Sequence, residues 1–337
     1  MSSSPPLATK TPESDAQEPA TTTISTSVFP QDSLAQSGPS MGGMDAHCTT
    51  DRPSPSSQTP TGELTKFNDD IDVYISKPAD YPHSPSKLLL LLTPGTGVKS
   101  TNNQLQADRY AGEGFVVVMP DQFGGDPAPN TTASAAESGS NGSEENVSLI
   151  EQVKLRAAET AKSFMIDMWL ARHTPEKVVP ILHKVLESAK DEFADAVANG
   201  GGVYAAGYCF GGKYVMMLAG KQQGSETEGK DEEAGKTDRR PLIKAGAIAH
   251  ATLVTREDMT AIEAPVSMVC VENDQLFPED ILKEGRKHLQ DQNIDHEIKT
   301  YPGVPHGFAV VGEYENPKIK DAQTAAFEQM LSWLKTH

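Results

Sequence analysis

The sequence predicts an α/β fold in which a mostly parallel central sheet carries helices on both faces. Short, continuous apolar runs such as Lys87–Leu92 and Phe115–Pro120 alternate along the chain with segments of helical periodicity. Strands buried on both faces have this continuous apolar pattern, and parallel neighbours need a helical crossover between them. About 250 residues show the alternation, which is enough for one large core.

The expected strands are short and apolar, and turn residues bound most of them. They cover residues 71–76, 87–92, 115–120, 202–207, 245–250, 265–271 and 296–301. The first two strands follow each other without a helix between them. Because a parallel pair needs a long crossover connection, we expect antiparallel pairing at the leading edge of the sheet.

The expected helices alternate with these strands, and several have recognisable ends. They cover residues 102–112, 148–172, 175–199 with an interruption near Pro180, 211–221, 256–262, 278–292 and 317–335. Asn102 is expected to cap the first of these helices. Ser148 and Glu151 form a capping-box pattern at the start of the second. Pro278 falls in a first turn, where proline is tolerated.

Three polar segments lie outside this pattern. Residues 1–60 are rich in Ser, Thr and Pro. They are expected to form a disordered tail, because they offer too little apolar surface to offset the entropy of ordering. Residues 61–337 are expected to form a single domain. Within it, low-complexity stretches near 126–147 and 221–240 are expected to be surface insertions.

Charge and cysteine content limit the possible classes of function. The 337 residues carry a formal net charge of −18. This charge argues against nucleic acid or a membrane as partner, since binding to nucleic acid or anionic lipid needs a basic face. The sequence shows no apolar stretch of membrane-spanning length and no signal-peptide core near its start. Three cysteines do not suggest a disulfide framework, so we expect a cytoplasmic protein.

The most informative motif is Gly207-Tyr-Cys-Phe-Gly211, which lies between an expected strand and an expected helix. This is the nucleophile-elbow pattern with cysteine in place of serine. The turn is so tight that side chains two residues on either side of the nucleophile would collide. The helix N-terminus behind Cys209 favours a thiolate. The alternative is a small buried cysteine in a glycine-rich turn.

An acid and a base follow the cysteine in the order that this motif requires. Asp274 comes directly after the strand 265–271, and His306 lies in a Pro/Gly loop after the strand 296–301. Ligands bind at the carboxyl ends of strands in open α/β sheets. Together the three residues predict a triad in which His306 takes the proton of Cys209 and Asp274 orients the imidazole.

The loop that follows the strand 87–92 allows two interpretations. An oxyanion formed at Cys209 needs two N–H donors, and Phe210 and Gly95 are the expected ones. The same stretch, with its Lys-Ser pair, suggests a nucleotide-binding loop. That motif requires glycines at positions occupied here by Thr93 and Val98, so the oxyanion role is favoured.

These motifs resemble the dienelactone hydrolase family of the α/β-hydrolase fold. The resemblance rests on "GYCFGG", "ENDQLFP", "PGVPHGF" and the upstream "NNQLQADRYAGEGFVVVMPDQFGGD". The resemblance extends to the fungal branch of the family, whose members carry a cysteine and a PTGE stretch before the domain. Cys48 and Thr59–Glu63 match this lead-in. The resemblance implies hydrolysis of a dienelactone ring without a cofactor. It also implies that Cys209 is the nucleophile, Asp274 the acid and His306 the base.

Two positions depart from the family pattern. Pro94 stands where the family usually has an acidic residue that contacts the resting cysteine, and Val310 stands where bacterial members have an arginine for the substrate carboxylate. A less charged ester, lactone or thioester is therefore as good a substrate candidate as dienelactone. The expected substrate pocket, with His250 at its rim, consists of Pro94, Thr96, Tyr208, His250, Phe308 and Val310.

Three hypotheses remain open from the sequence. The first is a hydrolase of small esters or lactones that works through a thioester, as a monomer or weak homodimer. The second is a non-catalytic α/β-hydrolase that binds a ligand or a protein. The third is a nucleotide-binding protein. Cys270 is expected in the core, and no metal-ligand cluster is visible in the spacing of the cysteines and histidines.

Overall fold

The computed structural model describes residues 46–129, 149–222 and 240–337. The predicted tail up to residue 45 and most of the two predicted insertions lie outside these ranges. Residues 46–60, which we assigned to the tail, lie inside them. Cys48 is fully buried and Arg52 is 8% exposed. The folded part of the chain therefore includes residues well before the predicted boundary at Thr61.

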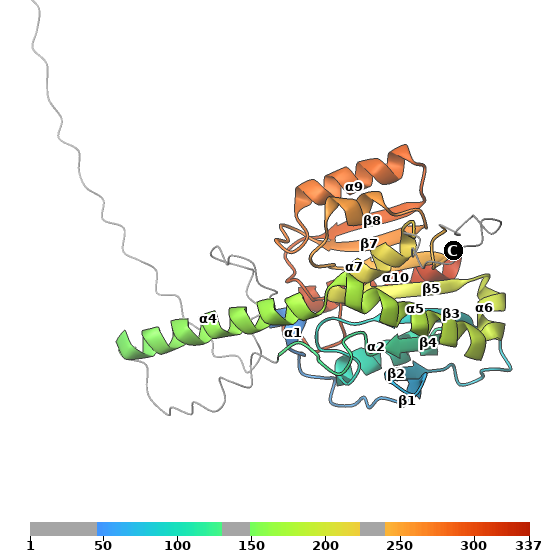
Figure 1. Ribbon diagram of the computed structural model, residues 1–337, viewed down its shortest axis with the longest axis horizontal. Coiled ribbons are helices and arrows are strands. Elements are labelled where there is room, and N and C mark those ends of the chain that lie inside the picture. Colours follow the sequence, from blue (N-terminus) through green and yellow to red (C-terminus); the bar gives the residue numbers. More distant parts are fainter. Residues whose placement is uncertain (1–45, 130–148, 223–239) are drawn as a thin grey trace, which may run out of the picture.

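The centre of the fold is an eight-stranded sheet with the order β1-β2-β4-β3-β5-β6-β7-β8 (Figure 1). The strands are β1 (Glu63–Phe67), β2 (Ile71–Ser76), β3 (Lys87–Leu92), β4 (Phe115–Pro120), β5 (Val203–Tyr208), β6 (Ala245–Ala249), β7 (Val266–Val271) and β8 (His296–Tyr301). Pairing is antiparallel from β1 to β2 and from β2 to β4, and parallel between all later neighbours. The leading edge is antiparallel as expected, but the first two predicted strands are not neighbours: β2 pairs with β4 instead of β3, and the edge includes a strand, β1, that we did not predict.

Helices cover both faces of the sheet, as predicted. The helices in the described ranges are α1 (Ala46–Thr49), α2 (Thr101–Gly112), α4 (Leu149–Arg172), α5 (Pro175–Glu192), α6 (Ala194–Gly200), α7 (Phe210–Ala219), α8 (Arg256–Thr260), α9 (Glu279–Asp291) and α10 (Pro317–Thr336). In β3, Leu89 and Leu91 pack against α2 and α10, whereas Leu88 and Leu90 face the cluster formed with α5 to α9. The first half of α4 extends beyond the rest of the fold (Figure 1).

Two local predictions were wrong. Helix α5 runs through Pro180 without a break and ends near Phe193, because its buried stripe, from Val178 to Ala189, holds it against the sheet. The cap of α2 is Ser100, whose hydroxyl accepts a hydrogen bond from the Asn103 N–H at 3.2 Å. Asn102 lies in the first turn and is buried.

The buried Asn102 instead holds the residues that precede the sheet, which we call the N-terminal segment (residues 46–53). Its side-chain amide donates to the Arg52 carbonyl at 2.7 Å. On the other side, the Pro53 carbonyl accepts from the Glu313 N–H at 2.9 Å. The Arg52 guanidinium lies 3.7 Å from the centre of the Tyr314 ring. The N-terminal segment is thus fastened between α2 and the loop before α10.

None of the helices in the described ranges combines the length and the apolar character that a membrane crossing requires.

Candidate active site

Cys209 lies in a strained turn between β5 and α7. Its φ angle is 51°, a value that a residue with a side chain rarely adopts. A Cβ atom added to Gly207 would lie 2.6 Å from the Gly211 carbonyl oxygen, and one added to Gly211 would lie 2.3 Å from the Leu92 carbonyl oxygen. The turn therefore needs glycine on both sides of Cys209, as the motif predicted.

Asp274 and His306 meet at the carboxyl ends of β7 and β8. The Nδ1 atom of His306 lies 2.8 Å from Asp274 Oδ2. The other carboxylate oxygen, Oδ1, accepts the Leu276 N–H at 2.9 Å. Because a carboxylate can only accept, Nδ1 of His306 carries a proton toward Asp274, and Nε2 is the ring nitrogen that faces the site.

The sulfur of Cys209 lies close to this imidazole. Burial by itself would raise the pKa of the thiol, but the neighbouring Cys48 thiol, the His306 ring and the Phe210 N–H outweigh it and lower the pKa to about 6. Burial by itself would lower the pKa of His306, but Asp274 and Cys209 raise it to about 10. Both shifts favour a thiolate beside an imidazolium.

The loop after β3 is tied to the same turn. The Thr93 carbonyl accepts the Gly211 N–H at 3.1 Å and the side-chain amide of Gln122 at 3.1 Å. Further along the loop, the Gly95 carbonyl accepts the Ala128 N–H at 2.8 Å. These bonds fix the position of the backbone next to the nucleophile turn, where the second oxyanion donor was expected.

Cys48 belongs to the site, although sequence reasoning gave it no role beyond the resemblance of its lead-in. Its sulfur, the sulfur of Cys209 and a ring nitrogen of His306 all lie within 4.8 Å of one another. The sequence showed no metal-ligand cluster, whereas the fold brings these three potential ligand atoms together. The spacing along the chain gave no signal, because the three residues come from distant segments.

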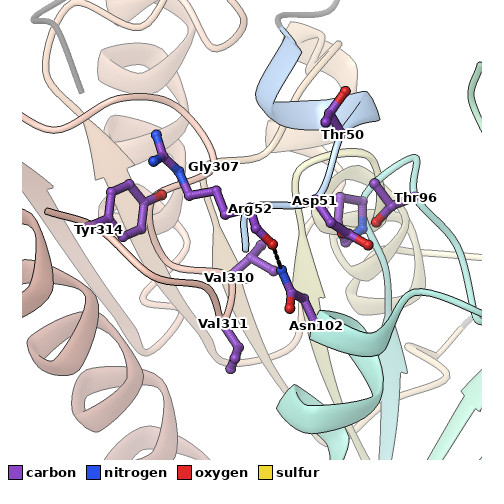
Figure 2. Close-up of a pocket in the computed structure, with 10 residues that line it drawn as sticks. Thr50, Asp51, Arg52, Thr96, Asn102, Gly307, Val310, Val311 and Tyr314 are labelled. Carbon is purple, nitrogen blue, oxygen red and sulfur yellow. Dashed lines mark hydrogen bonds between the residues drawn. The ribbon is translucent and has the colours of Figure 1, made fainter. Parts of the chain in front are cut away.

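Three of the six predicted pocket residues, Pro94, Thr96 and Val310, line one small cavity. The other lining residues are Thr50, Asp51, Arg52, Asn102, Gly307, Val311 and Tyr314. Figure 2 shows Arg52 lying between the loop with Thr96 and the segment with Tyr314. The cavity has a volume of about 20 Å³, which holds roughly one water molecule.

The N-terminal segment thus adds a carboxyl group and a guanidinium group to the pocket. Burial raises the pKa of Asp51, against the opposing effect of hydrogen bonds with Ser100 and Thr96. The sequence predicts both Asp51 and Arg52 to lie in a disordered tail. Their polar neighbours, rich in Ser and Pro, gave no pattern that distinguished them from it.

The other three predicted pocket residues lie elsewhere. Tyr208 and Phe308 are buried in the core cluster beneath α2 and α10. The Tyr208 hydroxyl is hydrogen-bonded to that of Tyr110 at 2.9 Å. His250 is fully buried rather than at the rim, and the centre of its ring lies 5.0 Å from that of His306. These side chains support the site from within the core.

Alkylation of Cys209 by iodoacetamide is expected to be fastest above about pH 6. The thiolate is the reacting species, and a folded-state pKa of about 6 means that it persists down to that pH and is lost below it. Mass spectrometry of the labelled peptide across a pH series measures the rate. Cys270 is the internal control, because burial raises its pKa to about 12. A midpoint near 8.5, the value of an ordinary thiol, would contradict the expectation.

The strand order, the strained cysteine turn after β5, and the carboxylate and histidine after β7 and β8 define the α/β-hydrolase class. The sequence model of the dienelactone hydrolase family matches residues 71–227 and 235–337. The chain belongs to that family.

Similar proteins agree with this assignment. The hydrolase pyvD of Aspergillus violaceofuscus is 29% identical, and the aligned region spans 82% of this chain and 90% of that protein. Dienlactone hydrolase 1 of Gibberella moniliformis is 25% identical over 82% of this chain and 87% of its own.

Solved structures support the fold. A candidate dienelactone hydrolase of Klebsiella pneumoniae superposes with a TM-score of 0.52 at 17% identity, over 82% of this chain and 99% of that one. A propionate-bound esterase of Thermogutta terrifontis superposes with a TM-score of 0.50 at 15% identity. The match covers 82% of this chain and 96% of the esterase. The family places this chain among the carboxylic ester hydrolases.

Proposed function

We propose that the protein hydrolyses a small carboxylic ester or lactone through Cys209, His306 and Asp274, with a thioester intermediate. The observation that carries the proposal is the 2.8 Å contact between His306 Nδ1 and Asp274, which directs Nε2 toward the sulfur held in the strained turn. This order of nucleophile, orienting carboxylate and base is the one required for acyl transfer.

The reaction proceeds in two halves. The Cys209 thiolate attacks the carbonyl carbon, and the N–H groups of Phe210 and Gly95 stabilise the negative charge that develops on the oxygen. The imidazolium of His306 gives its proton to the leaving alkoxide or enolate as the C–O bond breaks. His306 then takes a proton from water, which attacks the thioester and releases the acid and the Cys209 thiolate.

The pocket favours a substrate whose acyl group is small and carries no charged group. Val310 lines a cavity of only about 20 Å³ and stands where bacterial members of the family have an arginine for a substrate carboxylate. We also propose that the protein works as a monomer or weak homodimer in a reducing compartment such as the cytoplasm. None of Cys48, Cys209 and Cys270 takes part in a disulfide, which suits such a compartment.

A panel of activated esters, thioesters and lactones, with dienelactone included, tests this function. We expect turnover of short acyl substrates and, after rapid acid quenching, a mass increase equal to one acyl group on the peptide that contains Cys209. The Cys270→Ala variant is the matched control, because Cys270 lies within β7 and takes no part in the proposed reaction. Turnover with no acyl group on Cys209 at any quench time would argue for a different nucleophile.

The burial of the site is also compatible with a second candidate function, in which the protein binds a ligand without catalysis. Cys209 has no exposed surface, and the cavity lined by Pro94, Gly307 and Val310 holds roughly one water. If the whole panel fails to react while a panel member still binds with a measurable heat, the binding function is favoured over hydrolysis.

A further inference from the structure

Three ligand groups for a metal ion converge in the active site. The sulfurs of Cys48 and Cys209 and a ring nitrogen of His306 lie within 4.8 Å of one another, and all three residues are buried. Nδ1 of His306 is held by Asp274, so Nε2 is the nitrogen that remains. Nε2 is buried, and it makes no hydrogen bond of normal geometry to any residue in the described ranges. His306 as a whole is only 6% exposed.

The spacing of these atoms suits tetrahedral coordination. Zinc–sulfur bonds of about 2.3 Å and zinc–nitrogen bonds of about 2.0 Å place neighbouring ligand atoms about 3.5–3.8 Å apart. The observed upper limit of 4.8 Å therefore requires each pair to close by no more than about 1.0–1.3 Å. Two sulfurs with one imidazole make a soft donor set, which favours zinc over magnesium or calcium.

An outer-shell partner is also in place. Histidines that bind a metal usually donate their other ring N–H to a carboxylate, which fixes the tautomer and the direction of the ring. Asp274 makes this contact with His306, and the Leu276 N–H holds Asp274 in turn. The same carboxylate that would orient a catalytic base thus also orients a metal ligand.

We propose that Cys48, Cys209 and His306 form a binding site for one Zn²⁺ or similar thiophilic divalent ion, with water in the fourth position. Binding releases two protons to solvent, one from the Cys48 thiol and one from Nε2 of the His306 imidazolium, so that both sulfurs bind as thiolates and Nε2 binds through its lone pair. The ion occupies the sulfur and the nitrogen that acyl transfer needs, so the metal-bound protein does not hydrolyse esters.

Cys48 makes this site different from a simple cysteine–histidine pair. It is supplied by α1, and the bonds from Asn102 to Arg52 and from Glu313 to Pro53 hold the residues that follow it. The third ligand is therefore placed before any ion arrives, which lowers the entropic cost of binding. The remaining cysteine, Cys270, is outside this group.

Titration of the full-length protein with Co²⁺ in anaerobic buffer tests the site directly. We expect one equivalent to bind, with a thiolate-to-cobalt charge-transfer band and the strong visible bands of a tetrahedral ion. Cys48→Ser should lose about half of the charge-transfer intensity and bind at least about tenfold more weakly, since even the loss of an outer-shell partner has that effect. Asp274→Asn should weaken binding by about 10–100-fold.

Cys270→Ala is the matched control and should bind Co²⁺ as the wild type does. Circular dichroism of each variant separates a lost ligand from a lost fold. The proposal is overturned if the wild type gives no thiolate band, or if a folded Cys48→Ser variant keeps both the full band and the wild-type affinity.

Inhibition by Zn²⁺ gives a second readout. Zinc should stop ester hydrolysis by the wild type and a chelator should restore it, while a folded Cys48→Ser variant with residual activity should need at least about tenfold more zinc for half-inhibition. Equal sensitivity would show that Cys48 is not a ligand. The cobalt spectrum does not depend on catalytic turnover. It therefore tests the metal site independently of the proposed hydrolase function.

Discussion

Replacement of Cys209 with alanine is expected to lower kcat for ester hydrolysis by about 10⁶, because the attacking sulfur is removed and water must react without it. Loss of the nucleophile from a serine-protease triad has an effect of this size, and the remaining oxyanion donors leave only a small residual rate. Steady-state kinetics with a short activated ester, at matched protein concentrations, measures the change.

Two further variants make the result specific. Cys270→Ala should keep wild-type kcat, since its side chain lies in β7 outside the proposed machinery. His306→Ala should lose activity to an extent comparable with Cys209→Ala, because residues that act as one unit are strongly non-additive. An unchanged kcat in a folded Cys209→Ala variant would refute the mechanism.

Replacement of Gly211 with alanine is expected to lower the free energy of unfolding by about 3 kcal/mol or more. The added Cβ would lie 2.3 Å from the Leu92 carbonyl oxygen. That atom is backbone in the centre of the sheet, so it cannot move aside as a flexible side chain would. The bond between the Gly211 N–H and the Thr93 carbonyl would be strained as well. Thermal unfolding should shift downward by about 6–12 °C.

Gly112→Ala is the matched control for this substitution. Gly112 is the last residue of α2, and an added Cβ meets no atom within 4 Å. Alanine is favoured over glycine in a helix by up to about 1 kcal/mol, so the control should be neutral or slightly stabilised. Equal melting temperatures for the two variants would show that the nucleophile turn tolerates a side chain.

The sequence predicted the sheet well because its strands are apolar on both faces. β3 and β4 begin and end where their apolar runs do. β1 was missed for the opposite reason, since four of its five residues are not buried and it shows no inward-facing pattern. Residues 46–53 were missed because their order comes from contacts with α2 and Glu313, which lie far away in the sequence.

Tyr208, His250 and Phe308 do not line the cavity that Pro94, Thr96 and Val310 share, although Tyr208 and Phe308 are close in sequence to Cys209 and His306. Tyr208 directly precedes Cys209, but side chains alternate along a strand, so Tyr208 points into the core below α2. Phe308 follows His306 by two residues, yet its ring packs against Tyr301 with the ring centres 5.3 Å apart. Only the three-dimensional path of each loop separates these side chains from Pro94 and Val310.

The hydrogen bond from the Glu313 N–H to the Pro53 carbonyl affects the order in which the parts of the protein can fold. A ribosome makes residues 46–53 long before it makes Glu313, which holds them on their far side. The wall of the pocket that carries Asp51 and Arg52 therefore cannot close until Glu313 has been made. Joining such distant segments is also entropically slow, so we expect this wall of the pocket to form later than the local contacts within the sheet.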